Sequence, residues 1–193
     1  IVISLTHFKG HESTGFGGTL KNLGMGGGSR AGKMDMHSDE KPRVSQRRCV
    51  GCGACQKICA HGAPIIENKK CTIDHDRCVG CGRCGAICPK DAILPSYDAK
   101  SEILNAKIAE YSKAVVAGRP SFHISIVRDV APNCDCRPEN DAPIVPDVGM
   151  FASFDPVALD VACADAVNRQ PVLLHSQLGE TAHCDHDDHD HFH

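Results

Sequence analysis

The stretch RCVGCGACQKICA at residues 48–60 is nearly repeated as RCVGCGRCGAICP at residues 77–89. Both copies separate four cysteines by two, two and three other residues. The first run contains Cys49, Cys52, Cys55 and Cys59, and the second contains Cys78, Cys81, Cys84 and Cys88. Only the second copy closes with a proline, Pro89, where the first has Ala60. The doubled spacing indicates soft thiolate ligands arranged in two related halves.

This spacing matches the bacterial ferredoxin run for two [4Fe–4S] clusters, in which the fourth cysteine of each run ligates the other cluster. Two-residue gaps let a tight loop wrap three corners of an iron–sulfur cube, and glycines in the loop relieve crowding beside it. Each run closes only half of each cage, so the duplication completes both. We therefore assign one cluster to Cys49, Cys52, Cys55 and Cys88, and the other to Cys78, Cys81, Cys84 and Cys59.

Zinc is the alternative for paired C-x-x-C motifs, but a zinc site takes four ligands in two pairs rather than two runs of four. Ala60 is a mild departure from the ferredoxin pattern, because proline there would fix φ and remove an N–H donor. Since alanine removes no ligand, we expect ligation to survive. The potential of the cluster bound by Cys59 is expected to shift.

The composition of the 193 residues is that of a globular protein, with 41% hydrophobic and 23% charged residues and a formal net charge of −3. That balance does not favour nucleic acid as a partner. Thirteen cysteines grouped at two-residue gaps favour thiolate ligands over disulfides. No apolar run approaches the length of a membrane-spanning helix. We expect a cytoplasmic protein of a reducing, anaerobic setting.

The net charge of residues 42–95 bears on whether this region would be a built-in electron relay or a diffusing carrier. Residues 42–95 hold nine Lys or Arg and four Asp or Glu, a balance of +5. Two oxidised cubanes with their thiolates contribute about −2 each, which leaves about +1. A diffusing carrier often docks through a strongly charged face. The near-neutral balance therefore favours a built-in relay over a shuttle.

Strand and helix signals alternate on both sides of the repeat. Residues 1–8 and 122–130 predict strands, and 148–152 is a short apolar segment. Residues 101–117 predict an amphipathic helix, and Asp155 followed by Pro156 predicts the start of a second helix that reaches about residue 168. We expect an α/β host domain with an inserted α+β dicluster ferredoxin-like domain. The expected boundaries are 1–41 for the first part of the host, 42–95 for the insert, and 96–193 for the second part.

Both ends of the chain suggest truncation. Ile1 lies inside an apolar strand pattern, and the tail HCDHDDHDHFH follows no closing element. We therefore expect a host domain that is incomplete at both ends. The sequence does not decide whether a targeting signal preceded Ile1. The tail is expected to be a polar, partly disordered end, although such tracts can hold Zn²⁺ or Ni²⁺.

The end of the first predicted strand is the best candidate for a substrate or metal site. His7, Lys9 and His11 lie there, and ligands bind at strand ends in α/β sheets. Lys33 joins them as a candidate catalytic residue because it ends GGSRAGK, which has Walker A spacing from Gly27. Met34 occupies the position where a P-loop needs Ser or Thr, so a packed glycine-rich loop is favoured there, with an anion site as an alternative. For the histidines, the favoured alternative is an ordinary polar loop.

The remaining cysteines carry weaker signals. Cys134 and Cys136 place two thiols on one side of an extended loop and are candidate additional metal ligands. Cys71 and Cys163 are expected to be plain buried thiols, the first in the central strand of the insert and the second in the last helix.

The chain closely resembles the DUF362 family of uncharacterised iron–sulfur proteins. The resemblance is carried by residues 4–33, the two cysteine runs, NCDC at 133–136 and DAPIVPDVGMFASFDPVALD at 141–160. It implies a dicluster ferredoxin insert within an α/β domain that extends beyond both ends of this chain. The family implies architecture more than function.

Three functions remain open. The first is electron transfer through the two clusters to the host domain or to a partner redox protein. The second is an iron–sulfur oxidoreductase that binds a small-molecule substrate near His7, Lys9, His11 and Lys33. The third is a structural or oxygen-sensing cluster. No Ser-His-Asp, HExxH or kinase-type set argues for hydrolysis or phosphoryl transfer. The sequence leaves enzymatic activity undecided and leans against it; an enzyme of this kind would be an iron–sulfur oxidoreductase.

Overall fold

A computed structural model describes residues 1–37, 41–95, 100–136, 140–181 and 191–192 of the chain. The described residues form a mixed α/β structure with seven α-helices and small sheets. The chain divides into two compact units. The first comprises Ile1–Gly26 and Ala109–His193, and the second comprises Gly27–Ile108. The chain thus leaves the first unit, forms the second, and returns.

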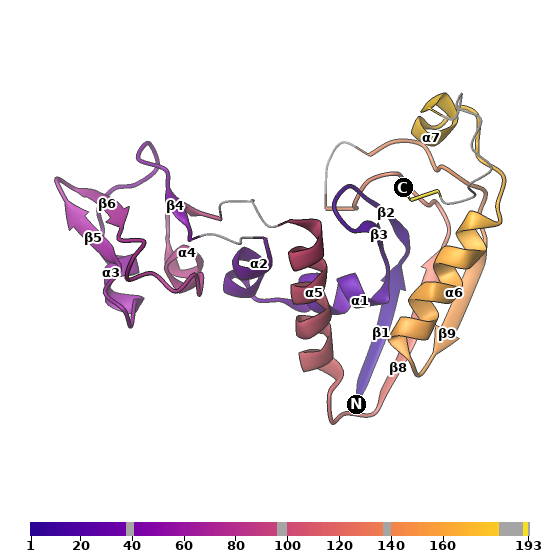
Figure 1. Ribbon diagram of the computed structural model, residues 1–193, viewed down its shortest axis with the longest axis horizontal. Coiled ribbons are helices and arrows are strands. Elements are labelled where there is room, and N and C mark those ends of the chain that lie inside the picture. Colours follow the sequence, from indigo (N-terminus) through magenta and orange to yellow (C-terminus); the bar gives the residue numbers. More distant parts are fainter. Residues whose placement is uncertain (38–40, 96–99, 137–139, 182–190, 193) are drawn as a thin grey trace. The chain divides into compact units, whose positions relative to one another are not determined.

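The first unit is built on a three-stranded sheet, whose order is β1-β8-β9. Strand β1 (Val2–His7) runs parallel to β8 (Ser121–Val127), from Val2 opposite Ser121 to His7 opposite Ile126. Strand β9 (Gly149–Ser153) runs antiparallel to β8 (Figure 1). Because β1 and β8 are parallel, their carboxyl ends lie at the same edge of the sheet.

Helix α6 (Pro156–Asn168) packs against β8 and β9 and closes the main core of this unit. It begins at Pro156 because the Asp155 carboxylate accepts hydrogen bonds from the backbone N–H groups of Val157, at 2.8 Å, and Ala158, at 3.2 Å. The core residues are Phe8, Val127, Val130, Ile144, Val145, Leu159, Cys163 and Val167. The remaining elements of the unit are β2 (Lys9–His11), β3 (Gly15–Gly17), α1 (Thr19–Lys21), the π-helix η1 (Asn22–Gly26) and α7 (Gln177–Thr181).

A buried carboxylate on α6 fixes the position of α1. Asp160 accepts hydrogen bonds from the backbone N–H groups of Thr19, at 2.6 Å, and Leu20, at 2.9 Å. Burial raises the pKa of Asp160, although these N–H groups oppose the shift. A Cβ at Gly18 would overlap the Asp160 carboxylate, so glycine permits this close approach. Because the hydrogen bonds to Asp160 fix α1, they also fix the position of Lys21, the last residue of that helix.

The second unit contains two short two-stranded antiparallel sheets and short helices. One sheet pairs β4 (Arg43–Val44) with β7 (Ile93–Leu94), and the other is a hairpin of β5 (Pro64–Glu67) and β6 (Lys70–Ile73). Its helices are α2 (Arg30–Met36), α3 (Ala54–Ile58) and α4 (Arg83–Ile87). Helix α5 (Ser101–Val116) crosses the boundary between the two units at residues 108 and 109.

The sequence repeat is also a structural repeat inside the second unit. Gly51 and Gly53 in the first copy have φ of +65° and +79°, and Gly80 and Gly82 in the second have +75° and +67°. These left-handed conformations turn each loop sharply into its short helix, which is why glycine recurs at these positions. The two helices, α3 and α4, then contact each other.

Several sequence predictions are confirmed. Strand 1–8 is β1, strand 122–130 is β8 with an earlier end, and segment 148–152 is β9. The helix predicted at 101–117 is α5, with Leu104 and Ile108 buried, and the helix opened by Asp155 is α6. The described residues contain no helix that is both long and apolar enough to cross a membrane.

The glycine-rich loop predicted around residues 27–33 is wrong. Residues 30–36 form helix α2, whose N-cap Ser29 accepts a hydrogen bond from Gly32 N–H at 3.1 Å. The helix contacts α4, and a Cβ at Gly85 would overlap Met34. Packing on α4 therefore outweighs the low helix propensity of glycine. The predicted insert, residues 42–95, lies inside the wider second unit.

Candidate functional site

The second unit brings together the two cysteine runs. Cys55 lies on α3 and Cys84 on α4, while Cys59 and Cys88 follow those helices directly as their C-cap residues. Both C-caps are extended, with ψ of 114° in each. Ala60 and Pro89 thus follow cap residues of the same backbone shape, and the missing proline does not change how the first helix ends.

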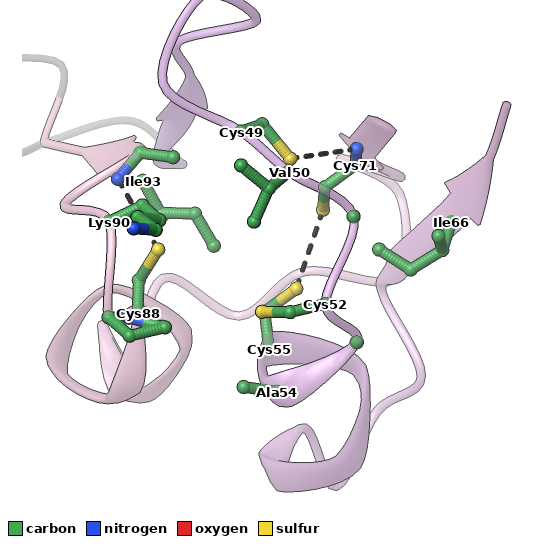
Figure 2. Close-up of a pocket in the computed structure, with 14 residues that line it drawn as sticks. Cys49, Val50, Cys52, Ala54, Cys55, Ile66, Cys71, Cys88, Lys90 and Ile93 are labelled. Carbon is green, nitrogen blue, oxygen red and sulfur yellow. Dashed lines mark hydrogen bonds between the residues drawn. The ribbon is translucent and has the colours of Figure 1, made fainter. Parts of the chain in front are cut away.

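A cavity of about 330 Å³ is lined by three cysteines of the first run and the last cysteine of the second. Figure 2 shows these side chains around the cavity, with Cys88 reaching it from the second copy of the repeat. Its walls are mainly apolar and include Val50, Ile66 and Ile93. The cysteines of the two runs that line this first cavity are Cys49, Cys52, Cys55 and Cys88; Cys71, outside the runs, lines it too.

A second cavity, of about 340 Å³, has the complementary composition. It takes three cysteines from the second run and the last cysteine of the first, and its walls include Pro64, Ile73 and Val79. The cysteines of this second cavity are Cys78, Cys81, Cys84 and Cys59. The folded chain therefore exchanges the last cysteine of each run between the two cavities.

Backbone N–H groups are directed at the sulfur atoms in both cavities. Cys71 N–H donates to Cys49 Sγ at 3.2 Å, and Ala92 N–H donates to Cys88 Sγ at 3.3 Å. In the second cavity Gly80 N–H donates to Cys78 Sγ at 3.5 Å. Hydrogen bonds of this kind stabilise negative charge on sulfur and tune the potential of a bound iron–sulfur cluster.

Cys71 is a ninth thiol of this unit, and the sequence predicted it only to be a buried cysteine. Its side chain lines the first cavity, is 1% exposed, and lies 3.6 Å from Cys55 Sγ (Figure 2). Burial, with the nearby Cys55 thiol, raises its pKa to about 12, so Cys71 remains a neutral hydrogen-bond donor. The alternation of β6, which turns Cys71 and Ile73 to one face, is the sequence signal for this position.

The surroundings of the two cavities favour a cationic occupant. Burial raises the pKa of Cys84 to about 11, because a thiolate in this apolar setting lacks water. Ionised thiolates are stable here only with positive charge beside them, as iron would supply. Among the described residues, no three or more His, Cys, Asp or Glu side chains form a group that could hold a metal ion.

A second polar site lies in the first unit, at the carboxyl ends of β1 and β8. His7 Nδ1 is 2.9 Å from Asp135 Oδ2, and its Nε2 is 2.8 Å from the carbonyl oxygen of Arg128. Each ring nitrogen of His7 therefore lies within hydrogen-bond distance of an acceptor oxygen. The buried Lys9 ammonium is 3.2 Å from the same Asp135 oxygen. Burial opposes ionisation of Asp135, but the hydrogen bond from His7 and the charge of Lys9 outweigh it and lower its pKa.

The neighbouring Cys134 is a buried, polarised thiol. It is 3% exposed, and Lys21 Nζ donates to its Sγ at 3.0 Å. His11 and Cys136 also form side-chain hydrogen bonds with it. Burial by itself would raise the pKa of Cys134, but these bonds outweigh burial and lower it to about 5. Cys134 is therefore a thiolate at neutral pH, with an ammonium group beside it.

The tautomer of His11 follows from its backbone contacts. Its Nδ1 accepts hydrogen bonds from the N–H groups of Ser13, at 3.0 Å, and Thr14, at 3.2 Å. A ring nitrogen that accepts carries no proton, so the proton of the neutral ring is on Nε2. His11 is thereby a hydrogen-bond donor toward Cys134, and its Nε2 lone pair is not available to a metal.

The structure thus joins two groups of candidates that the sequence treated separately. His7, Lys9 and His11 lie in the first unit together with Cys134 and Cys136, whereas Lys33 lies on α2 of the second unit. Asp135 and Lys21, which connect the group, were not predicted as site residues; the charged residue between the thiols of NCDC was the available signal for Asp135. Most of the His/Asp-rich tail lies outside the described residues.

Comparison with known proteins identifies one relationship. A family model described as Domain of unknown function (DUF362) matches residues 1–165. No curated protein and no solved structure matches the chain. The matched range includes both cysteine runs and the Cys134 site.

Proposed function

The chain belongs to the DUF362 family, and on that premise we propose that its second unit is a ferredoxin-like domain that transfers electrons through two [4Fe–4S] clusters. Cys49, Cys52, Cys55 and Cys88 would hold one cluster. Cys78, Cys81, Cys84 and Cys59 would hold the other. Both the identity of these ligands and the assignment of the second unit as ferredoxin-like are part of the proposal.

One observation carries the proposal. Two cavities of similar size each present four cysteines of the two runs, three from one run and one from the other, and Cys71 also lines the first cavity. This exchange is the ligand pattern of two-cluster bacterial ferredoxins. A zinc site takes four ligands in two pairs, whereas each cavity here takes three cysteines from one run and one from the other, which favours cubanes over zinc.

The residues around the thiols would set the properties of the clusters. Apolar side chains such as Val50 and Ile93 line the first cavity and limit access of water to it. N–H donors to Cys49 and Cys88 lower the charge density on those sulfurs and favour the reduced state. Cys55 and Cys84, one from each quartet, belong to the same packed core. A short path for electrons between the cavities is thus expected through that core.

A bound [4Fe–4S] cluster supplies one-electron transfer, and two of them allow the chain to accept and pass single electrons in sequence. The near-neutral charge of residues 42–95 supports a relay to the first unit or to a redox partner protein over a free carrier.

Anaerobic purification, iron and sulfide analysis, and EPR-monitored redox titration test this function. We expect about eight irons and eight acid-labile sulfides per chain, and two reversible one-electron couples. Stoichiometric zinc with no iron would disprove the proposal. Clusters that show no reversible couple would instead indicate a structural or oxygen-sensing role.

The second candidate is an iron–sulfur reductase, favoured by the polar group at the sheet edge. Lys9 presents positive charge there, and the imidazole of His7 adds a polar ring beside the same Asp135 carboxylate. An anionic or carbonyl substrate would suit such a site at the end of parallel strands. Reoxidation of the dithionite-reduced protein by a candidate substrate would favour this function, provided that replacing Lys9 with Met abolishes it.

A further inference from the structure

We propose that Cys134 and Cys136 form a dithiol–disulfide redox couple that reacts by exchange with low-molecular-weight disulfides. The couple uses residues of the first unit and does not depend on the clusters. It differs from a metal site, the role considered for the two thiols from sequence. Three structural observations support it.

The first observation is the pairing of the thiols. Cys134 and Cys136 form a side-chain hydrogen bond with each other. Asp135 and Cys136 lie in a turn, which brings the flanking Cα atoms closer than the roughly 7 Å of an extended chain. Disulfides need Cα atoms about 4.4–6.8 Å apart, so the turn brings the pair toward bonding geometry.

The second observation is the different exposure of the two sulfurs. Cys136 is exposed, whereas Cys134 is buried. An incoming disulfide therefore meets Cys136 first, and only a neighbouring thiol can reach the buried sulfur. This division into an attacking thiol and a resolving thiol is what a two-cysteine exchange site requires.

The third observation is the fixed environment of the buried sulfur. Lys21 Nζ is 3.0 Å from Cys134 Sγ, and the backbone contacts of His11 direct a ring N–H rather than a lone pair toward it. An ammonium group and an N–H donor stabilise a thiolate, but they occupy the positions that additional metal ligands would take. The set therefore suits a nucleophile better than a zinc site.

The reaction is balanced as follows. Cys134 is the thiolate of the pair, and the proton lies on Cys136. The Cys136 sulfur attacks a disulfide RSSR as its proton passes through solvent to the departing RS⁻; the S–S bond of RSSR breaks and RSH leaves. The Cys134 thiolate then attacks Cys136 Sγ, the mixed disulfide breaks, and a second RS⁻ leaves. In sum, the dithiol is oxidised by two electrons and RSSR is reduced to RSH and RS⁻.

The anchoring of the loop supports this role. Asp135, between the two cysteines, is held by His7 and Lys9 at the ends of β1 and β2. The loop is fixed again where Gly10 N–H donates to the Ala131 carbonyl at 2.8 Å. Because Asp135 is held in place, the side chains of Cys134 and Cys136 on either side of it have little freedom. This favours a disulfide between these two cysteines over a lasting disulfide with another molecule.

The test is anaerobic incubation of the full chain with oxidised glutathione, followed by acid quenching, alkylation and peptide mass mapping. In the wild type we expect a Cys134–Cys136 disulfide without a lasting glutathione adduct. Cys134→Ser should retain glutathione on Cys136. Lys21→Met should slow loss of the adduct about tenfold, because fewer resolving thiols are ionised.

Cys163→Ser is the matched control, since Cys163 is a buried cysteine of the same unit, and it should form the same disulfide as the wild type. Three outcomes would overturn the proposal: both thiols remain reduced in the wild type, Cys136 pairs with a different cysteine, or one tightly bound Zn²⁺ per chain protects both thiols. The wild-type and Lys21→Met measurements remain decisive if Cys134→Ser fails to fold. Visible absorption of the clusters, recorded in parallel, separates this result from any failure of the electron-transfer proposal.

Discussion

Replacing Cys88 with alanine tests the proposed exchange of ligands between the two cysteine runs. Cys88 belongs to the second run but lines the first cavity together with three cysteines of the first run. Its removal leaves three of the four proposed ligands at that cavity and all four at the other. Alanine offers no oxygen as a substitute ligand, so one cluster of two should be lost. We expect iron to fall from about eight to about four per chain.

Differential alkylation shows which cluster is lost. Thiols that ligate iron are protected from an alkylating reagent, and thiols freed by the substitution react. In Cys88→Ala the other three proposed ligands, Cys49, Cys52 and Cys55, should become labelled, although they lie 33 to 39 residues before the substitution. The cysteines of the second cavity should remain protected.

The matched control is Cys71→Ala, which removes a thiol of the same cavity that lies outside both runs. We expect this variant to keep about eight irons, because Cys71 donates its thiol hydrogen to the Thr72 carbonyl oxygen and is not one of the proposed ligands. Labelling of Cys78, Cys81 and Cys84 in Cys88→Ala, with the first three cysteines protected, would refute the crossed assignment. Retention of all eight irons in Cys88→Ala would refute the role of Cys88.

Three further predictions concern the first unit, each measured by the midpoint of thermal unfolding. Gly10→Ala should lower the free energy of unfolding by about 1–3 kcal/mol, because its Cβ would overlap the Pro132 carbonyl; an unchanged midpoint would contradict the close packing. Asp155→Ala should cost about 1 kcal/mol through loss of the cap of α6, and Asp155→Asn should restore most of it. The folded pKa of Cys134, about 5, lies below its ordinary 9.0, so its stabilising effect is present at high pH and is lost as the pH falls through 5. The midpoint should therefore fall more between pH 9 and pH 5 in the wild type than in Cys134→Ala, and equal slopes would exclude a depressed pKa.

Local sequence was sufficient for the regular elements. Asp155 followed by Pro156 predicted where α6 begins, because capping and a preset φ act within one helical turn. The pattern of Leu104 and Ile108 predicted α5 for a similar reason. The prediction failed at residues 27–33, where packing between Met34 and Gly85 makes a glycine-rich segment helical. That contact joins residues far apart in the sequence and leaves no local pattern.

The same distinction between local sequence patterns and contacts of distant segments applies to the candidate sites. The sequence by itself determined the two quartets of thiols, because a doubled spacing with glycines at the loop turns is compatible with few ligand arrangements. Only the tertiary structure brought Lys21 to Cys134, 113 positions away, and His7 to Asp135, 128 positions away. Those contacts depend on the parallel pairing of β1 with β8 and on the Asp160 contact that fixes α1. Spacing along the chain encodes geometry within a turn or a loop, whereas contacts between distant segments are decided by how those segments pack.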